Sequence, residues 1–202
     1  MNDTATATPA TEVRPDRLAA GLAYVKHAMG TEPMRPILMG VLFEGTEDGL
    51  YLVAADNYRV ARAKVDDEDW TAFGRVTVAA EELPLIVAFL KRKPLGVATI
   101  TNPGSPYLTI AQGGRQIVVR AIDGQYPNYR SIIPTSIDRT IEANPRYLAE
   151  AVSAAKAAGF MVATLILRDR FDPIMVGSSD GEFIEIIMPV RTSSEPTAWE
   201  PK

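Results

Sequence analysis

Basic side chains recur along the chain at a fixed interval. Lys26, Lys91 and Lys156 lie 65 residues apart, and each follows an apolar stripe of helical spacing. Lysine and arginine attract phosphate groups without reading bases, so such a series can hold a nucleic-acid backbone. The alternative is that a lysine stem covers apolar surface while its ammonium group stays in water. For any single lysine this alternative is the stronger interpretation.

Further basic side chains lie on the same segments: Arg14, Arg17, His27, Arg92, Lys93 and Arg146. The net charge of -4 argues against nucleic-acid binding only if charge is spread evenly. The acidic run at 66–69 predicts a different face, one that would repel nucleic acid. Such a run can also bind a metal, but consecutive carboxylates are usually a solvated turn.

Few residues belong to the types that carry catalysis. The chain has no cysteine and a single histidine, His27, and no glycine-rich phosphate loop precedes a helical segment. Disulfides, thiolate metal sites and cysteine nucleophiles are therefore excluded, and we expect no enzyme, no metal site and no cofactor. No apolar run approaches the roughly 20 residues that cross a bilayer. The first residues do not form a signal peptide, so we expect a cytoplasmic protein.

Three segments, 14–30, 81–93 and 144–159, have the periodicity of amphipathic helices. Asn144 is a suitable cap and Gly159 a suitable stop. Apolar positions keep the same interval as the lysines, which indicates an internal repeat. These positions are Leu18, Leu83 and Leu148, followed by Leu22, Val87 and Val152.

Each helical segment precedes sequence typical of strands. These stretches are 36–45 and 49–65 after the first, 96–102 and 106–123 after the second, and 161–169 and 173–190 after the third. Gly113-Gly114 predicts a hairpin turn, and residues 179–181 have the same role. One helix and three or four strands cannot bury their own apolar face, so the units should pair across a shared core. The pattern predicts an α+β protein of repeated helix-plus-antiparallel-sheet half-domains, with helices on one side of the sheets.

The expected boundaries follow from the linkers. Residues 1–13 form a disordered tail, and residues 14–134 form a domain of two half-units, 14–70 and 75–134. Residues 135–191 form a third half-unit, and 192–202 form a flexible tail.

Five stretches together resemble the bacterial DNA polymerase III beta sliding clamp family, and they occur in the family's order. They are RPILMGVLFE, LYLVAADNYRVARAKV, AIDGQYPNYRSIIP, NPRYLAEAV and EIIMPVR. The resemblance implies the sliding-clamp fold, with sheets outside a ring and helices around duplex DNA. It covers the family's middle domain and the second half of its last domain. Three half-units in each chain, set against twelve in a ring, predict a homo-oligomer, by this count a tetramer.

The resemblance also assigns the residues. The recurring basic side chains become a sequence-independent face for double-stranded DNA. A second surface becomes a groove for peptides of a DNA polymerase and other partners, and a clamp loader would open the ring. The groove residues are Leu38, Ala55, Asn57, Tyr58, Arg59, Val60, Pro127, Ser131, Ile132, Ile186, Met188, Pro189, Val190 and Arg191.

The groove is also chemically reasonable without the family. Its aliphatic side chains and Met188 suit the apolar side chains of an extended peptide, and its prolines limit the entropy lost on binding. The other interpretation is that Val60, Ile132 and Met188 are ordinary core residues. The pair Asn57-Tyr58 stands where the family usually has Gly-His, and Ser131 where it often has a second arginine, which affects partner preference.

The leading hypothesis is therefore a non-enzymatic processivity factor that encircles DNA and tethers a polymerase. The alternative is a clamp mimic that binds clamp-interacting peptides or the loader without closing on DNA, as a regulator or inhibitor.

Overall fold

The computed structural model describes residues 10–91, 96–102, 104, 106–133, 140–178 and 183–190. The chain divides into two compact units, Met1–Tyr129 (unit 1) and Arg130–Lys202 (unit 2), which are described separately. The division lies inside the segment 121–134, where the sequence predicted a boundary after residue 134. Among the described helices none is long and apolar enough to span a membrane.

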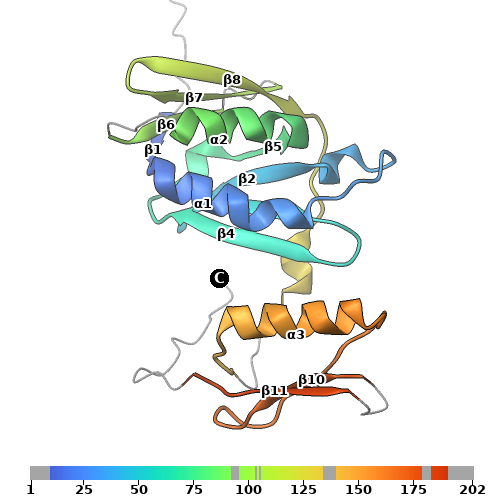
Figure 1. The fold of residues 1–202 in the computed structure, drawn as a ribbon. Coiled ribbons are helices and arrows are strands. Elements are labelled where there is room, and N and C mark those ends of the chain that lie inside the picture. Colours follow the sequence, from blue (N-terminus) through green and yellow to red (C-terminus); the bar gives the residue numbers. More distant parts are fainter. Residues whose placement is uncertain are drawn as a thin grey trace, which may run out of the picture. The chain divides into compact units, whose positions relative to one another are not determined.

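Unit 1 is one antiparallel sheet of eight strands in the order β1-β6-β7-β8-β5-β2-β3-β4 (Figure 1). Its strands are β1 (Ala10–Val13), β2 (Gly40–Thr46), β3 (Gly49–Ala55), β4 (Val60–Asp66), β5 (Arg75–Ala79), β6 (Ala98–Thr101), β7 (Tyr107–Gln112) and β8 (Arg115–Ile122). Its helices are α1 (Pro15–Val25) and α2 (Leu83–Lys91), and its short 3-10 turns are η1 (Lys26–Ala28), η2 (Pro36–Leu38), η3 (Thr71–Phe73) and η4 (Ala80–Glu82).

The two halves of unit 1 exchange strands. We define the first half as α1 with β2, β3 and β4, and the second half as α2 with β6, β7 and β8. Strand β1 precedes α1 but pairs with β6, and β5 precedes α2 but pairs with β2. Each half thus supplies the strand that covers the first strand of the other, and β5 also joins β8 to make the sheet continuous.

Strand β1 corrects the expectation of a disordered tail over residues 1–13. Residues 10–13 pair with β6 in regular antiparallel register, and Val13 is buried in the core. The partner strand lies about 90 residues away in the sequence, and for that reason local composition did not reveal this pairing. Residues 1–9 lie outside the described part of the chain.

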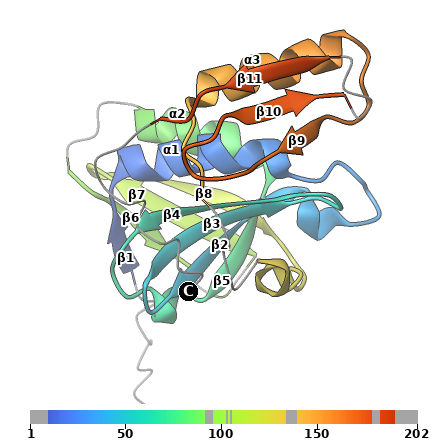
Figure 2. The same ribbon diagram turned by 90° about the horizontal axis from the view of Figure 1, so that it is seen from below.

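Helices α1 and α2 contact each other and cover the same face of the sheet (Figure 2). One hydrophobic core lies beneath them, with Leu18 and Leu22 from α1, Ile86 from α2, and Phe43 and Ile100 from the sheet. This shared core confirms the expectation that half-units pair, because neither helix alone covers the sheet's apolar face.

Local signals set several element ends. Gly113 and Gly114 have φ of 55° and 74° in the β7–β8 hairpin, as a two-residue turn requires. The second helical segment begins with the 3-10 turn η4, so α2 itself starts at Leu83 rather than near Glu81. In unit 2 the Asn144 side chain accepts a hydrogen bond from the backbone N–H of Arg146, which confirms Asn144 as a cap.

Unit 2 consists of a single half-unit. It contains η5 (Tyr129–Ile132, at the junction with unit 1), α3 (Pro145–Ala157), β9 (Thr164–Ile166), β10 (Ile174–Gly177) and β11 (Ile184–Ile187). The strand order is β11-β10-β9, and the hairpin predicted at 179–181 lies outside the described residues. Buried Ala151 of α3 packs on Ile174, Val176 and Ile187.

Gly21 sets the distance between α1 and the sheet. A Cβ atom at this position would lie 2.4 Å from Cγ1 of Val65 and 3.0 Å from Cδ1 of Leu52. We therefore expect Gly21→Leu to lower the free energy of unfolding by about 1–3 kcal/mol, the usual cost of overpacking, measured by urea denaturation. The control Ala20→Leu, on the exposed side of the same helix, should stay within about 0.5 kcal/mol. Equal effects of the two changes would contradict close packing at Gly21.

Candidate functional site

The turn between β3 and β4 forms one wall of a small pocket. Four of the predicted groove residues line this pocket: Leu38, Asn57, Tyr58 and Arg59. The pocket has a volume of about 140 Å³ and is completed by Met29, Gly30, Thr31, Glu32, Arg35 and Asp56. Two segments that are separated in the sequence, 29–38 and 56–59, therefore meet here.

Asp56 fixes the shape of this turn. Its Oδ1 accepts hydrogen bonds from the backbone N–H groups of Tyr58 (2.8 Å) and Arg59 (3.0 Å), and its Oδ2 accepts one from Nε of Arg59 (2.9 Å). The hydrogen bond from Tyr58 is the main cause that lowers the pKa of Asp56, and the Arg59 contacts add to it. The carboxylate thus stays ionised and holds the turn across the neutral range.

Neighbouring side chains brace the pocket. Asn57 accepts a hydrogen bond from Arg35 (2.6 Å) and donates one to Glu32 (3.0 Å). Tyr58 is 93% exposed at the tip of the turn, so its ring is available to a partner. Asp56, Glu32 and Arg35 were not among the predicted residues, because polar residues around a turn do not show which side chains they will reach.

The remaining groove predictions lie elsewhere. Ala55 and Val60 are paired in register at the base of the turn, where Ala55 is buried, and Pro127 is exposed. In unit 2, Ser131 and Ile132 lie in η5, Ile186 lies on β11, and Met188, Pro189 and Val190 follow that strand. Ile132, Ile186 and Met188 are each at least 60% exposed, so they are not core residues. Arg191 lies outside the described part of the chain.

Two tyrosines anchor the last residues of unit 1, 121–129, to its sheet. Tyr126 and Tyr129 are both buried, and the Tyr129 hydroxyl donates a hydrogen bond of 2.5 Å to Oε2 of buried Glu44. The other carboxylate oxygen of Glu44 lies 3.3 Å from Nε of Arg75. Burial raises the pKa of Tyr126 to about 12, so this ring is a neutral anchor. The aromatic residues of this segment therefore hold it in place.

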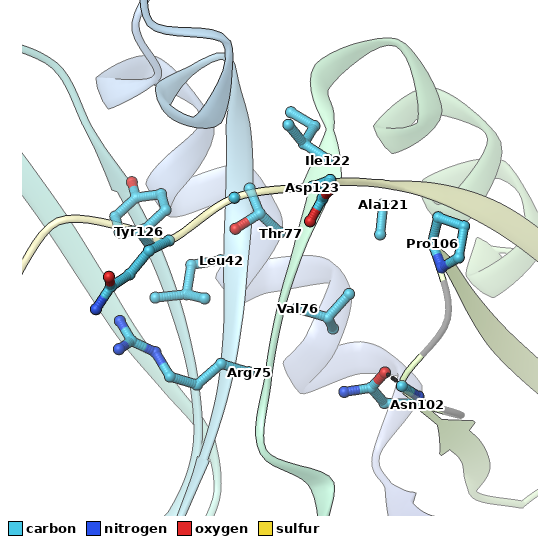
Figure 3. Close-up of a pocket in the computed structure, with 13 residues that line it drawn as sticks. Leu42, Arg75, Val76, Thr77, Asn102, Pro106, Ala121, Ile122, Asp123 and Tyr126 are labelled. Carbon is cyan, nitrogen blue, oxygen red and sulfur yellow. Dashed lines mark hydrogen bonds between the residues drawn. The ribbon is translucent and has the colours of Figure 1, made fainter.

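A cleft of about 860 Å³ opens where β5 and β8 diverge (Figure 3). Leu42 and Thr77, which alternate with core residues along their strands, line it together with the core residues Val76 and Ala121. Asp123 and Arg75 are its charged side chains, and Asn102 is bonded to the backbone oxygen of Phe73. No three histidine, aspartate or glutamate side chains in the described residues are arranged to hold a metal ion.

The predicted basic face is divided between free and paired charges. Lys26, Lys91 and Lys156 are exposed and make no ion pair within the described residues. Other cations are neutralised by carboxylates: Arg14 by Asp16 at 2.6 Å, Arg17 by Asp67 at 3.0 Å, and Arg146 by Glu150 at 2.8 Å. Nδ1 of His27 donates a hydrogen bond of 2.8 Å to the backbone oxygen of Tyr24, and Arg92 and Lys93 lie outside the described residues.

The acidic run at 66–69 corrects one expectation. Asp67 binds Arg17 of α1 and Lys64, so this run is attached to the helical side of unit 1 and does not mark a separate outer face. Asp66 accepts a hydrogen bond from Nε1 of buried Trp70, and Asp69 caps the following turn through Thr71. The run therefore forms a structured turn.

Comparisons with known proteins agree with this architecture. The family model described as DNA polymerase III beta subunit, central domain, matches residues 12–128 of this chain. A beta sliding clamp of Synechococcus elongatus is 28% identical over 141 residues, which are 67% of this chain and 36% of the relative. One of Buchnera aphidicola is 21% identical over 177 residues, 83% of this chain and 43% of the relative. The chain thus spans about two fifths of the length of these relatives.

Solved structures show the same fold. The sliding clamp of Bacillus subtilis superposes with a TM-score of 0.73 at 20% identity, over 95% of this chain and 52% of that one. A sliding clamp of Bartonella birtlesii, bound to griselimycin, gives a TM-score of 0.64 at 16% identity, over 95% and 68%. The central-domain match covers more than half of the chain and coincides with unit 1. The chain therefore belongs to the bacterial DNA polymerase III beta subunit family, the beta sliding clamps.

Proposed function

We propose that this protein is a DNA sliding clamp, a processivity factor that encircles duplex DNA and tethers a replicative polymerase. The observation that carries the proposal is the arrangement of unit 1. Its helices α1 and α2 cover one face of a continuous sheet, and Lys26 and Lys91 are exposed without an ion pair among the described residues. Ammonium groups that touch phosphates without reading bases allow a protein to slide. The protein acts by holding other proteins and carries out no catalysis of its own.

Encirclement requires several copies. Unit 1 provides two half-units and unit 2 provides a third, so four copies would supply the twelve half-units of a ring. The exposed sheet edges β4 and β9 offer unpaired backbone groups that neighbouring copies can use. The chain has no glycine-rich phosphate loop, so opening of the ring in the cytoplasm would fall to a separate clamp loader.

Each unit offers its own surface for peptides. In unit 1 the pocket beside Asp56 would take an apolar side chain against Leu38 and polar groups near Tyr58. In unit 2 the exposed Ile132 and Met188 would contact apolar side chains of a polymerase peptide. Asn57-Tyr58 and Ser131 replace residue types common in the family, so we propose that the preferred peptides differ from those of other clamps.

The first prediction of this function concerns DNA. Changing Lys26, Lys91 and Lys156 together to Glu should weaken association with duplex DNA at least tenfold at about 0.1 M salt. The change should also lower the slope of log K against log salt by about 2–3, because fewer counterions are released. Binding is measured by fluorescence anisotropy with linear and closed circular DNA.

Two comparisons complete this test. Arg120→Glu, an exposed residue beside core residue Val119 on β8, should leave DNA binding nearly unchanged. A ring loaded on closed circular DNA should remain bound and should leave after linearisation. If the protein leaves closed circular and linear DNA equally fast, and if the lysine changes do not affect DNA binding, the results would instead support the clamp mimic that does not close on DNA.

The second prediction concerns the groove. Ile132→Ala combined with Met188→Ala should weaken binding of a polymerase-derived peptide about 100-fold or more, because two exposed apolar contacts are lost. Isothermal titration calorimetry measures the affinity. The control change Met161→Ala with Val162→Ala removes two apolar side chains that are even more exposed and lie outside the proposed groove, and it should have no effect. Unchanged affinity in the first variant would place the groove elsewhere.

A further inference from the structure

Unit 2 exposes an unusual amount of apolar surface for its size. Its described core contains only Ala151, Ile174, Val176 and Ile187 as buried residues. Large apolar side chains that are about half exposed or more include Val152, Leu165, Leu167, Phe171 and Phe183. A large exposed apolar surface on a small unit indicates an interaction surface.

The internal repeat identifies which of these residues should be buried. Phe43 of β2 and Ile100 of β6 occupy the same place on the first strand after their helices, and both are 0% exposed. Leu165 of β9 is 65 residues beyond Ile100 and occupies that place in unit 2, yet it is 55% exposed. The equivalent side chain is therefore buried in both halves of unit 1 and exposed to solvent in unit 2.

In unit 1 a neighbouring strand covers the edge on which this side chain lies. The outer edge of β6 is covered by β1, with Thr11 opposite Ile100, and the outer edge of β2 is covered by β5, with Val76 opposite Phe43. In both cases the covering strand precedes the helix of the other half. Among the described residues of unit 2, β9 has a strand on one side only.

Unit 2 possesses the corresponding covering segment. Residues 140–143 precede α3 as β5 precedes α2, and they lie 65 residues after 75–78. The backbone N–H of Val190 donates a 2.8 Å hydrogen bond to the oxygen of Glu142. That bond repeats the pairing of Thr77 with Ile122, through which β5 adjoins the last strand of its own half. The segment is therefore placed beside β11 and away from β9, which lies at the other end of the sheet.

We propose that unit 2 is completed by unit 2 of a second copy of this chain, related by a twofold axis. Residues 140–143 of each copy add to β9 of the other as an antiparallel strand. The register transferred from β1 and β6 sets Ile141 opposite Leu165 and Ala143 opposite Ala163. The result is one six-stranded sheet with two short covering segments, built as unit 1 is built from its own two halves.

The helices support the same partner. In unit 1 the two helices contact each other, and Leu22 is buried while Val87 is partly buried. The equivalent Val152 of α3 is 49% exposed, and pairing of α3 with its twofold copy would cover it. A second copy suits this surface because the repeat already shows that such halves fit one another. The inference goes beyond the proposed function, since it holds whether or not the assembly surrounds DNA.

Cysteine cross-linking tests the register directly, because the natural chain has no cysteine. Ile141→Cys and Leu165→Cys are prepared as separate proteins of different mass, mixed and oxidised. Residues directly opposite in an antiparallel pair have Cα atoms about 4.5–5.5 Å apart, which lies within the range that a disulfide can bridge. We expect a mixed dimer in high yield. The control Glu142→Cys with Leu165→Cys should give at least about tenfold less, because neighbouring strand residues point to opposite faces.

A charge at the interface supplies the second readout. Leu165→Glu should weaken self-association about 100-fold, because the interface between the two copies would bury two unpaired carboxylates. Sedimentation equilibrium measures this association. Ile184→Glu is the matched control, because Ile184 is 58% exposed and pairs with Gly177 on the sheet face away from α3. It should not change self-association. Circular dichroism melting checks that both variants fold.

Three results would overturn the proposal: a protein that stays monomeric, a dimer that gives no Ile141–Leu165 cross-link, or equal effects of the two glutamate variants. DNA binding and peptide binding are not read in these experiments, so a failure here is distinct from a failure of the clamp function.

Discussion

The fold depends on one constraint: a half-unit of one helix and three strands cannot bury its own apolar face. Unit 1 meets the constraint by joining two halves in one sheet and one core, with β1 and β5 each covering the other half. Burial of Phe43 and Ile100 is the consequence. Unit 2 has the same construction but lacks a second half within the described residues, which leaves Leu165 open to solvent.

Sharing a sheet also separates the two proposed binding surfaces. Both helices of unit 1 lie on one face, and so do the cations that follow them. The pocket beside Asp56 is formed instead by the turn that joins β3 to β4 and by residues 29–38. Residues 121–129 are held against the sheet by the buried Tyr126 and Tyr129, and Tyr129 bonds Glu44, which in turn pairs with Arg75. Under the proposed function, DNA and a peptide would be held at different places of this scaffold.

The features that the sequence revealed are those that depend on neighbouring residues. Asn144 and Gly159 mark the ends of α3, and Gly113 and Gly114 mark the β7–β8 hairpin, because capping and turn geometry are local. Strand β1 was missed because its partner β6 is distant in the sequence. The Glu44–Tyr129 bond and the Arg17–Asp67 pair were missed for the same reason, and the latter reversed the expected place of the acidic run. In the site, residue types indicated the groove, but not the hydrogen bonds that shape it.

The most direct test of the shared-core account is the mass of the intact particle, measured by native mass spectrometry over a range of protein concentrations. Completion of unit 2 by a twofold copy predicts assemblies with an even number of chains, and four chains for a closed ring. A particle that remains a single chain at every concentration, or one that contains three chains, would contradict the account.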